Sequence, residues 1–90
     1  MEKDEQRVWD IWGEIFIDRT YKMDPEREFE VSDVFPNEWK VNFDKGERIA
    51  MGGAVRKALE DVVLNHRLMH VEPLGVPGAP YHHRYMRRSH

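Results

Sequence analysis

The sequence contains no cysteine, so neither a disulfide framework nor a thiolate metal site can form within the chain. It also lacks any apolar run of about 18 residues or more, the length that a membrane-spanning helix needs. The first five residues, Met1 to Glu5, are mostly acidic, whereas a secretory signal begins with basic residues. These absences predict a soluble protein of the reducing cytoplasm.

Motifs for catalysis are missing as well. The sequence has no nucleophile motif, no Walker loop and no dinucleotide fingerprint, and the pair Gly52-Gly53 is too short and lies within a helical pattern. His66 and His70 are four residues apart, but a tight zinc site usually also needs thiolates or a well-placed carboxylate. We therefore expect no enzymatic activity, no cofactor and no metal site.

Aromatic residues are plentiful for a chain of this size. Three Trp, four Phe and three Tyr occur among 90 residues, although 34% of the residues are charged. Such an aromatic content predicts a folded chain rather than a disordered one. The length suits one small hydrophobic core, so we expect a single domain over residues 1–90.

The charge of the chain changes sign along its length, although the net charge is only −3. Residues 1–30 contain ten Asp or Glu and five Lys or Arg, whereas residues 40–90 contain five acidic and nine basic residues. A locally positive surface can attract a polyanion even when the whole protein is acidic. The C-terminal half is therefore the expected side for a nucleic acid, unless its basic end is only a solvated tail.

An amphipathic helix is predicted over residues 4–19. Its apolar residues recur at helical spacing, with two aromatic residues at the margin of the stripe: Val8, Ile11, Trp12 and Ile15, then Trp9 and Phe16. Asp4 is the expected N-cap, and the helix is expected to end before Pro25. The stripe is expected to face the core, although so wide an aromatic face could also seat a second subunit.

Two short elements are expected next. Phe29 and Val31 alternate with polar residues, which is typical of a very short strand. Residues 32–40 are predicted to form a short helix that Ser32 or Asp33 caps.

The longest helix is predicted over residues 46–65, because Asp44 and Glu47 have the spacing of a capping box. One face is apolar and is expected to pack on the N-terminal helix: Met51, Val55, Ala58, Leu59 and Val62. The opposite face is expected to carry Ala50, Gly53, Arg56, Lys57, Glu60 and Asp61.

The pair Gly52-Gly53 needs a reason, because glycine inside a helix costs about 1 kcal/mol relative to alanine. One reason is close approach of the helix to another surface, such as a DNA backbone or groove floor. The other is close packing against the N-terminal helix, or a helix that starts only at Ala54. The sequence leaves these alternatives open.

A β-hairpin is predicted over residues 67–88, where two segments alternate in polarity. Pro73 to Pro80 is expected to form an irregular tip, because three prolines and two glycines in eight residues cannot continue a strand ladder. Arg84, Arg87 and Arg88 lie on or beyond the returning strand and are expected to clamp backbone phosphates.

A helix with small residues and cations, followed by a basic β-ribbon, is typical of a winged helix-turn-helix. The order of a short strand, a helical turn, Trp39, the segment Gly46 to Val55 and a hairpin ending in Tyr81 to Tyr85 resembles small single-domain winged-helix proteins of bacteria, phages and plasmids. Trp39, the Gly-x-Arg of Gly46 to Arg48, and Gly52 resemble a short uncharacterised bacterial family of that kind. The resemblance implies an α+β fold of about three helices packed on a C-terminal hairpin wing, and a role in DNA binding or transcriptional control.

Double-stranded DNA is therefore the predicted partner. The helix over residues 46–65 is expected to enter the major groove by its first turns only, because Glu60 and Asp61 would repel phosphate. A homodimer is expected, since one small module offers little interface. The predicted contacts are Arg48, Ala50, Gly53, Arg56, Lys57, Arg84, Arg87 and Arg88.

The alternative hypothesis is a protein-interaction module, such as a phage or plasmid-encoded inhibitor of a host complex. The acidic residues of the N-terminal helix favour it, among them Asp10, Glu14 and Asp18. Fold class alone does not separate the two functions.

Overall fold

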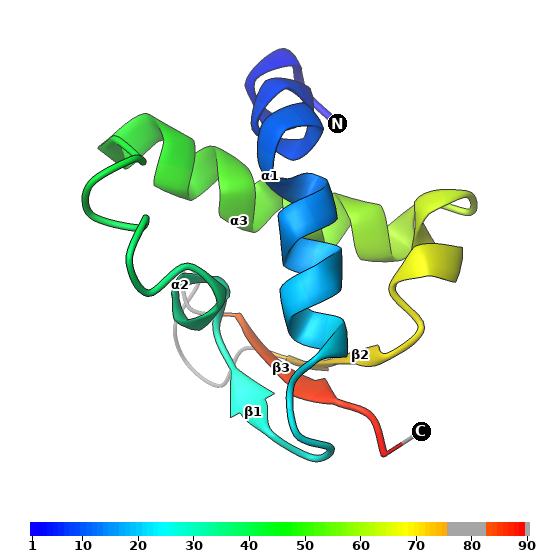
Figure 1. Cartoon of the computed structure of the whole chain (residues 1–90). Helices are drawn as coiled ribbons and strands as arrows, with labels where there is room; N and C mark the ends of the chain where they lie inside the picture. Colours follow the sequence, from blue (N-terminus) through cyan, green and yellow to red (C-terminus); the bar gives the residue numbers. More distant parts are fainter. Residues whose placement is uncertain (76–82, 90) are drawn as a thin grey trace.

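The computed structural model describes residues 1–75 and 83–89 of the chain. Its elements follow in the order α1 (Lys3–Tyr21), β1 (Glu28–Phe29), α2 (Val31–Val34), α3 (Lys45–Glu60), the 3-10 helix η1 (Leu64–Arg67), β2 (Val71–Gly75) and β3 (Arg84–Arg87). The helices lie on one side of a small antiparallel sheet with the strand order β1-β3-β2 (Figure 1). The expected α+β class is therefore confirmed.

The first helix, α1, begins earlier than the sequence predicted. Its N-cap is Glu2 and not Asp4, because the carboxylate of Glu5 folds back and accepts a hydrogen bond from the Glu2 N–H at 2.7 Å. The helix ends at Tyr21, before Pro25, as expected.

The buried side of α1 is rotated from the predicted stripe. Val8, Trp9 and Phe16 are buried, whereas Ile11 is 58% exposed. Trp12 is partly buried and contacts the aromatic residues that follow α2, including Phe43 at a ring-centroid distance of 4.8 Å. Because α1 packs on α3 and on these aromatic residues at once, the centre of its buried side moves toward Trp9 and Phe16.

The short helix α2 is smaller than predicted. The expectation of a helix over residues 32–40 is wrong, because α2 starts at Val31 and ends at Val34, ahead of Pro36. The expected strand likewise ends at Phe29, since Val31 already belongs to α2. Turns follow and carry the aromatic residues Phe35, Trp39 and Phe43, whose rings contact one another.

The long helix α3 has the predicted start and a shorter end. Asp44 and Glu47 form the expected capping box: the Glu47 N–H donates to Asp44 Oδ1 at 2.8 Å, and the Asp44 N–H donates to Glu47 Oε1 at 3.0 Å. The helix ends at Glu60 and not near residue 65, because the Asp61 carboxylate accepts hydrogen bonds from the backbone N–H groups of Val63 and Leu64. Val62, expected on the buried face, is 79% exposed beyond that end.

The predicted hairpin forms, and β3 pairs on its other side with β1. Pro73 and Gly75 belong to β2 and not to the tip, and residues 76–82 of the expected tip lie outside the described residues. The sheet tolerates Pro73 because β2 is an edge strand. The N–H of Arg88 donates to the carbonyl of His70. Because successive residues of a strand point their backbone N–H and C=O groups to alternate sides, the backbone nitrogen of Pro73 points away from β3, toward the unpaired edge of β2.

The core lies between the helices and the inner face of the sheet. Met51, Val55 and Ala58 of α3 are fully buried, as predicted. Phe29 and Tyr85 pair across β1 and β3, with ring centroids 5.9 Å apart, and burial raises the pKa of Tyr85 to about 12. The sheet therefore contributes aromatic side chains to the same core that α1 and α3 close.

Candidate nucleic-acid interface

One narrow side of α3 is largely exposed in the described structure. At about 100° per residue, this side carries Lys45, Ile49, Gly52 and Arg56, which we call the outer stripe of α3. Lys45, Ile49 and Arg56 are exposed, Ile49 to 65%. Among residues 1–75 and 83–89, none packs within 4 Å of the point where a Cβ on Gly52 would stand. The described residues therefore leave the stripe uncovered.

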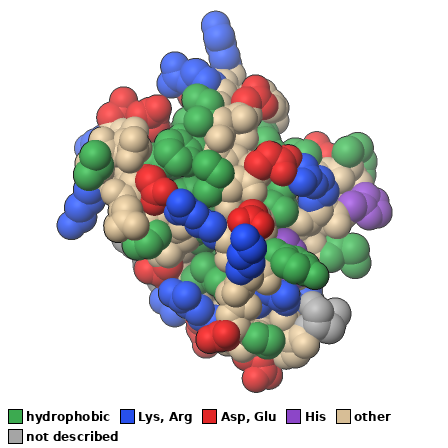
Figure 2. Space-filling view, in the orientation of Figure 1, with side chains coloured by type: hydrophobic (Ala, Val, Ile, Leu, Met, Phe, Trp, Pro, Cys, Tyr) green, Lys and Arg blue, Asp and Glu red, His purple; other side chains and the backbone are tan. Residues whose placement is uncertain are grey.

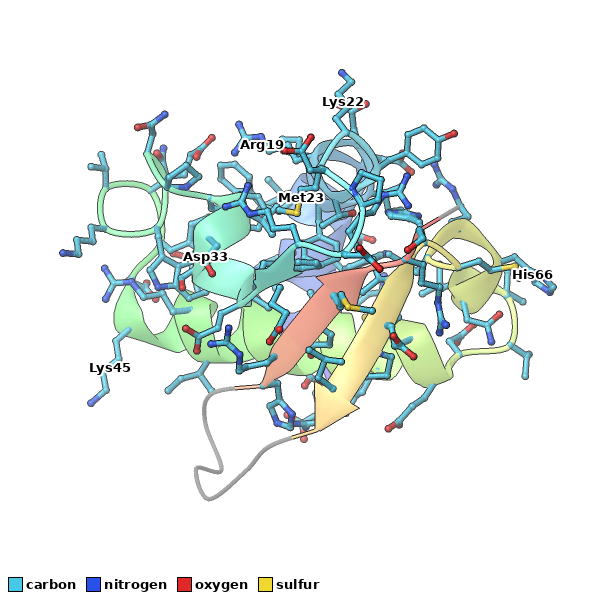
Figure 3. The ribbon with its side chains drawn as sticks, turned by 90° about the horizontal axis from the view of Figure 1, so that it is seen from below. Arg19, Lys22, Met23, Asp33, Lys45 and His66 are labelled. Carbon is cyan, nitrogen blue, oxygen red and sulfur yellow. The ribbon has the colours of Figure 1, made fainter. Side chains whose placement is uncertain are left out.

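The start of β3 lies beside this stripe. Nη1 of Arg56 is 3.3 Å from Nε2 of His83, and Arg56, His83 and Arg84 share a shallow hollow of about 150 Å³. A second hollow of about 140 Å³ is lined by Gly52 and His83 among other residues. Figure 3 shows Lys45 at the start of α3, at the other end of this helix from the 3-10 helix that carries His66. Arg56 of α3 and Arg84 of β3 therefore adjoin the same hollow.

Two predicted contacts, Ala50 and Gly53, are buried, so the expectation that they lie on the exposed face is wrong. Ala50 is 8% exposed. Gly53 lies against α1, where a Cβ would stand 2.2 Å from Oε2 of Glu5. Close packing of two helices is thus the reason for glycine at position 53, and it does not apply to Gly52.

Lys57, a third predicted contact, forms an ion pair between helices. Its Nζ donates to Oε1 of Glu5 at 2.7 Å, and Glu5 is itself buried. Burial alone would raise the pKa of Glu5, but the hydrogen bonds from Lys57 and from the Glu2 N–H outweigh it and lower the pKa. The carboxylate stays ionised and holds Lys57 toward α1 rather than toward a phosphate.

Two of the predicted arginines connect parts of the fold. Nε of Arg48 donates to the carbonyl of Trp39 at 2.7 Å, which ties α3 to the turns after α2. Arg87 is 8% exposed, and its Nε and Nη2 both donate to the carbonyl of Tyr21 at 3.2 Å. Its guanidinium also lies over the Tyr21 ring, 5.2 Å from the centroid. Arg87 thus joins β3 to the end of α1.

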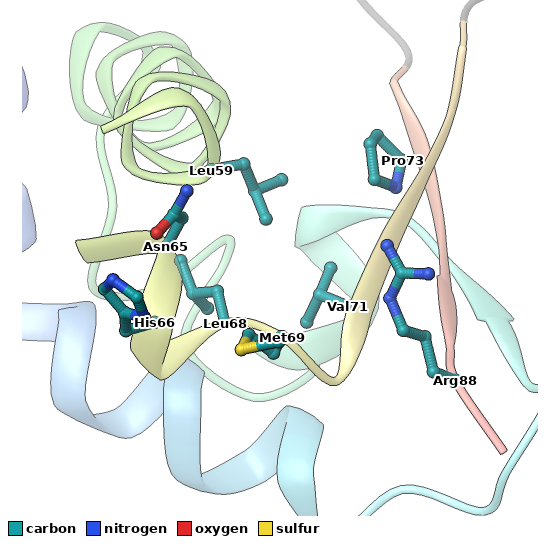
Figure 4. Close-up of a pocket in the computed structure, with 8 residues that line it drawn as sticks. All are labelled: Leu59, Asn65, His66, Leu68, Met69, Val71, Pro73 and Arg88. Atoms are coloured by element: carbon teal, nitrogen blue, oxygen red, sulfur yellow. The ribbon is translucent and has the colours of Figure 1, made fainter. Parts of the chain in front are cut away.

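The remaining two, Arg84 and Arg88, lie toward opposite ends of the returning strand. Arg84 is next to the outer stripe and forms a long ion pair with Glu28, Nε to Oε1 at 3.6 Å. Arg88 pairs with Glu72 at 3.7 Å. It lines a groove of about 610 Å³ below the end of α3, as Figure 4 shows. Arg84 and Arg88, which were predicted to contact DNA together, therefore lie at different places, and of the two only Arg84 adjoins the outer stripe.

The acidic residues of α1 do not form a uniform patch. Glu14 accepts hydrogen bonds from Arg67, and Asp18 pairs with Lys22 at 3.0 Å. Oδ1 of Asp10 accepts a hydrogen bond from the side-chain amide of Gln6. Figure 2 shows acidic and basic side chains interspersed on this side of the molecule.

Sequence reasoning missed Lys45 and Ile49 and placed the exposed face about one position too far around the helix. The reason is that α3 is buried on two sides, against α1 through Gly53 and against the core through Met51 and Val55. The signal was present in the spacing, since Lys45, Ile49, Gly52 and Arg56 follow one another at i, i+4, i+7 and i+11.

The described residues contain no group of three or more His, Asp or Glu arranged to hold a metal ion. Among the same residues, no helix combines the length and the apolar character needed to cross a membrane. Comparisons of the chain with protein-family models, curated proteins and solved structures found no match.

Proposed function

We propose that this chain is a winged-helix protein that binds double-stranded DNA through the outer stripe of α3 and the start of β3. The observation that carries the proposal is the position of Arg56, which is exposed on α3 and adjoins His83 and Arg84 of the hairpin. Exposed cations on a helix and an adjoining strand can contact phosphates, and an arginine among them can also contact a base edge.

The order of the elements supports the proposal. In a winged helix-turn-helix, two consecutive helices are followed by a hairpin, and here α2 and α3 precede β2 and β3. The strand before α2 pairs with β3, which gives the sheet order β1-β3-β2 and anchors the hairpin beside α3. This arrangement fits a helix that inserts into the groove and a strand that contacts the DNA backbone.

The charges favour modest, salt-sensitive binding. The protein carries a net charge of −3, so attraction to DNA depends on the local field of the outer stripe and Arg84. Within the stripe, Lys45 and Arg56 are cationic, and the next exposed residue along it is Glu60. Insertion of α3 from Lys45 as far as Arg56, with Glu60 kept away from phosphate, is the orientation that avoids repulsion.

A titration with a pool of random duplexes at several salt concentrations tests the proposal. Binding should weaken as salt rises, and Arg56→Ala or Lys45→Ala should each lower the slope of log affinity against log salt by about 1. Arg7→Ala is the matched control, because this α1 side chain is 63% exposed and is not part of the outer stripe. No binding at low salt, or binding that ignores salt, would reject the proposal.

The second candidate is a protein-interaction module that acts through the acidic side of α1. It has less support, because Glu14 and Asp18 already pair with basic residues of the same chain. Charge reversal at Asp10, Glu14 and Asp18 separates the two functions. Loss of partner capture with unchanged DNA binding would favour the interaction module.

A further inference from the structure

We infer that Ile49 is a specificity-determining residue that contacts the 5-methyl group of thymine, while Arg56 reads guanine a short distance along the same groove. The inference rests on the proposed function, because it requires α3 to lie in the major groove of a duplex. It assigns separate tasks to two residues of the outer stripe.

Ile49 is exposed at the place that DNA would cover. Its side chain is 65% exposed and lies between Lys45, one turn earlier, and Arg56, two turns later, on the same side of α3. A duplex that contacts both cations therefore has to remove Ile49 from water. An aliphatic side chain gains free energy only against an apolar surface, and the thymine methyl is the apolar group that bases present in the major groove.

Gly52 makes the approach possible. It occupies the stripe between Ile49 and Arg56, and no described residue lies within 4 Å of the point where its Cβ would stand. A larger residue there would project toward the DNA and keep its two neighbours away from the groove floor. Glycine in the middle of an exposed helix face lowers stability, and close approach of DNA supplies a reason for it that packing within the described residues does not.

Arg56 has the chemistry and the position to read a guanine. Its guanidinium is exposed and lies next to His83, with Nη1 3.3 Å from Nε2, which directs the group toward the hairpin side of the stripe. Arginine donates two hydrogen bonds to O6 and N7 of guanine. Helices that dock in the groove meet successive bases about every three to four residues, so Ile49 and Arg56 should read positions about two base pairs apart.

Thymine-to-uracil replacement tests the assignment of Ile49, because it removes only the methyl group. Duplexes selected from a random pool are synthesised with uracil in place of each thymine in turn, and the affinity of the full chain is measured. We expect one position at which uracil weakens binding about fourfold, as for the loss of one buried methyl-sized group. Ile49→Ala should bind the thymine and uracil duplexes equally.

Two further variants complete the experiment. Val63→Ala removes an apolar side chain that is 71% exposed beyond the end of α3, and it should keep the full preference for thymine. Arg56→Ala removes the guanidinium donors and should reduce the preference for guanine about tenfold or more.

The outcomes distinguish this inference from the function on which it rests. Failure to bind any duplex would reject the proposed function together with the inference. Two results would reject only the assignment of Ile49. One is salt-dependent binding with equal affinity for thymine and uracil duplexes, and the other is a preference for thymine that is unchanged in Ile49→Ala. Unchanged guanine preference in Arg56→Ala would reject the assignment of Arg56.

Discussion

Glu5 of α1 and Gly53 of α3 touch where the two helices pack, with the carboxylate of Glu5 occupying the space that a side chain at position 53 would fill. A Cβ on Gly53 would stand 2.2 Å from Oε2 and 3.2 Å from Cδ of Glu5. The same carboxylate accepts hydrogen bonds from Lys57 and from the Glu2 N–H, both at 2.7 Å. One buried acid therefore caps α1 and joins it to α3, and this arrangement depends on glycine at position 53.

The two adjacent glycines of α3 should respond in opposite ways to the same substitution. Gly52→Ala should raise the free energy of unfolding by about 0.5–1 kcal/mol, because alanine favours the helix and its methyl group meets none of the described residues. Gly53→Ala should lower it by about 1 kcal/mol, because the Glu5 carboxylate must move and weaken its hydrogen bonds. Urea unfolding followed by tryptophan fluorescence measures both changes.

A double mutant provides the control for this pair. In a Glu5→Ala background the obstructing carboxylate is gone, so Gly53→Ala should become stabilising, like Gly52→Ala. If Gly53→Ala destabilised both backgrounds equally, the contact with Glu5 would not be the reason for glycine at this position.

His70 should make stability depend on pH. It is 8% exposed, and its Nε2 lies 2.8 Å from Oγ1 of Thr20. The Thr20 hydroxyl already donates to the carbonyl of Phe16, so the imidazole N–H is the donor to Thr20. Burial, and then the charge of Arg87, lowers the pKa of His70 below its ordinary value of 6.5. The folded protein therefore favours the neutral ring.

The sign of the pH effect follows from this lowered pKa. The contribution of His70 to stability is complete above its ordinary pKa and is lost as the pH falls through the lower pKa of the folded state. The melting temperature should therefore decrease as the pH is lowered from about 7.5 to about 5.5. In His70→Gln the fall should be smaller, and an unchanged fall would assign the effect to other groups.

The sequence placed Arg87 and Arg56 in one binding site, but we expect Arg87 to stabilise the fold and Arg56 to contact DNA. Arg87→Ala should lower the free energy of unfolding by about 2–3 kcal/mol, because a buried guanidinium that donates to the Tyr21 carbonyl is lost. Arg56→Ala should change stability by less than about 0.5 kcal/mol, since its side chain is exposed. Thermal unfolding measures the stability of the two variants, and the duplex titration measures their DNA binding. If the two substitutions changed stability equally and DNA binding equally, the distinction between Arg87 and Arg56 would be wrong.

Local chemistry explains which elements were predicted well. The capping box of Asp44 and Glu47 marks the start of α3 because both hydrogen bonds lie within one turn of chain. The end of α1 before Pro25 and the buried face of α3 through Met51 and Val55 depend in the same way on nearby residues. The prediction of a helix over residues 32–40 is wrong beyond Val34, because Pro36 follows and the ring of Phe35 packs against Trp12 of α1.

The sequence by itself determined the α+β class, the existence of its long helices and hairpin, and the supply of cations in the C-terminal half. Tertiary structure alone decided which of those cations are exposed. Lys57 and Arg87 turn inward because their partners, Glu5 and the carbonyl of Tyr21, come from α1, more than 50 residues away in sequence. Residue spacing records only local geometry, whereas the burial of a charge depends on which distant element packs against it.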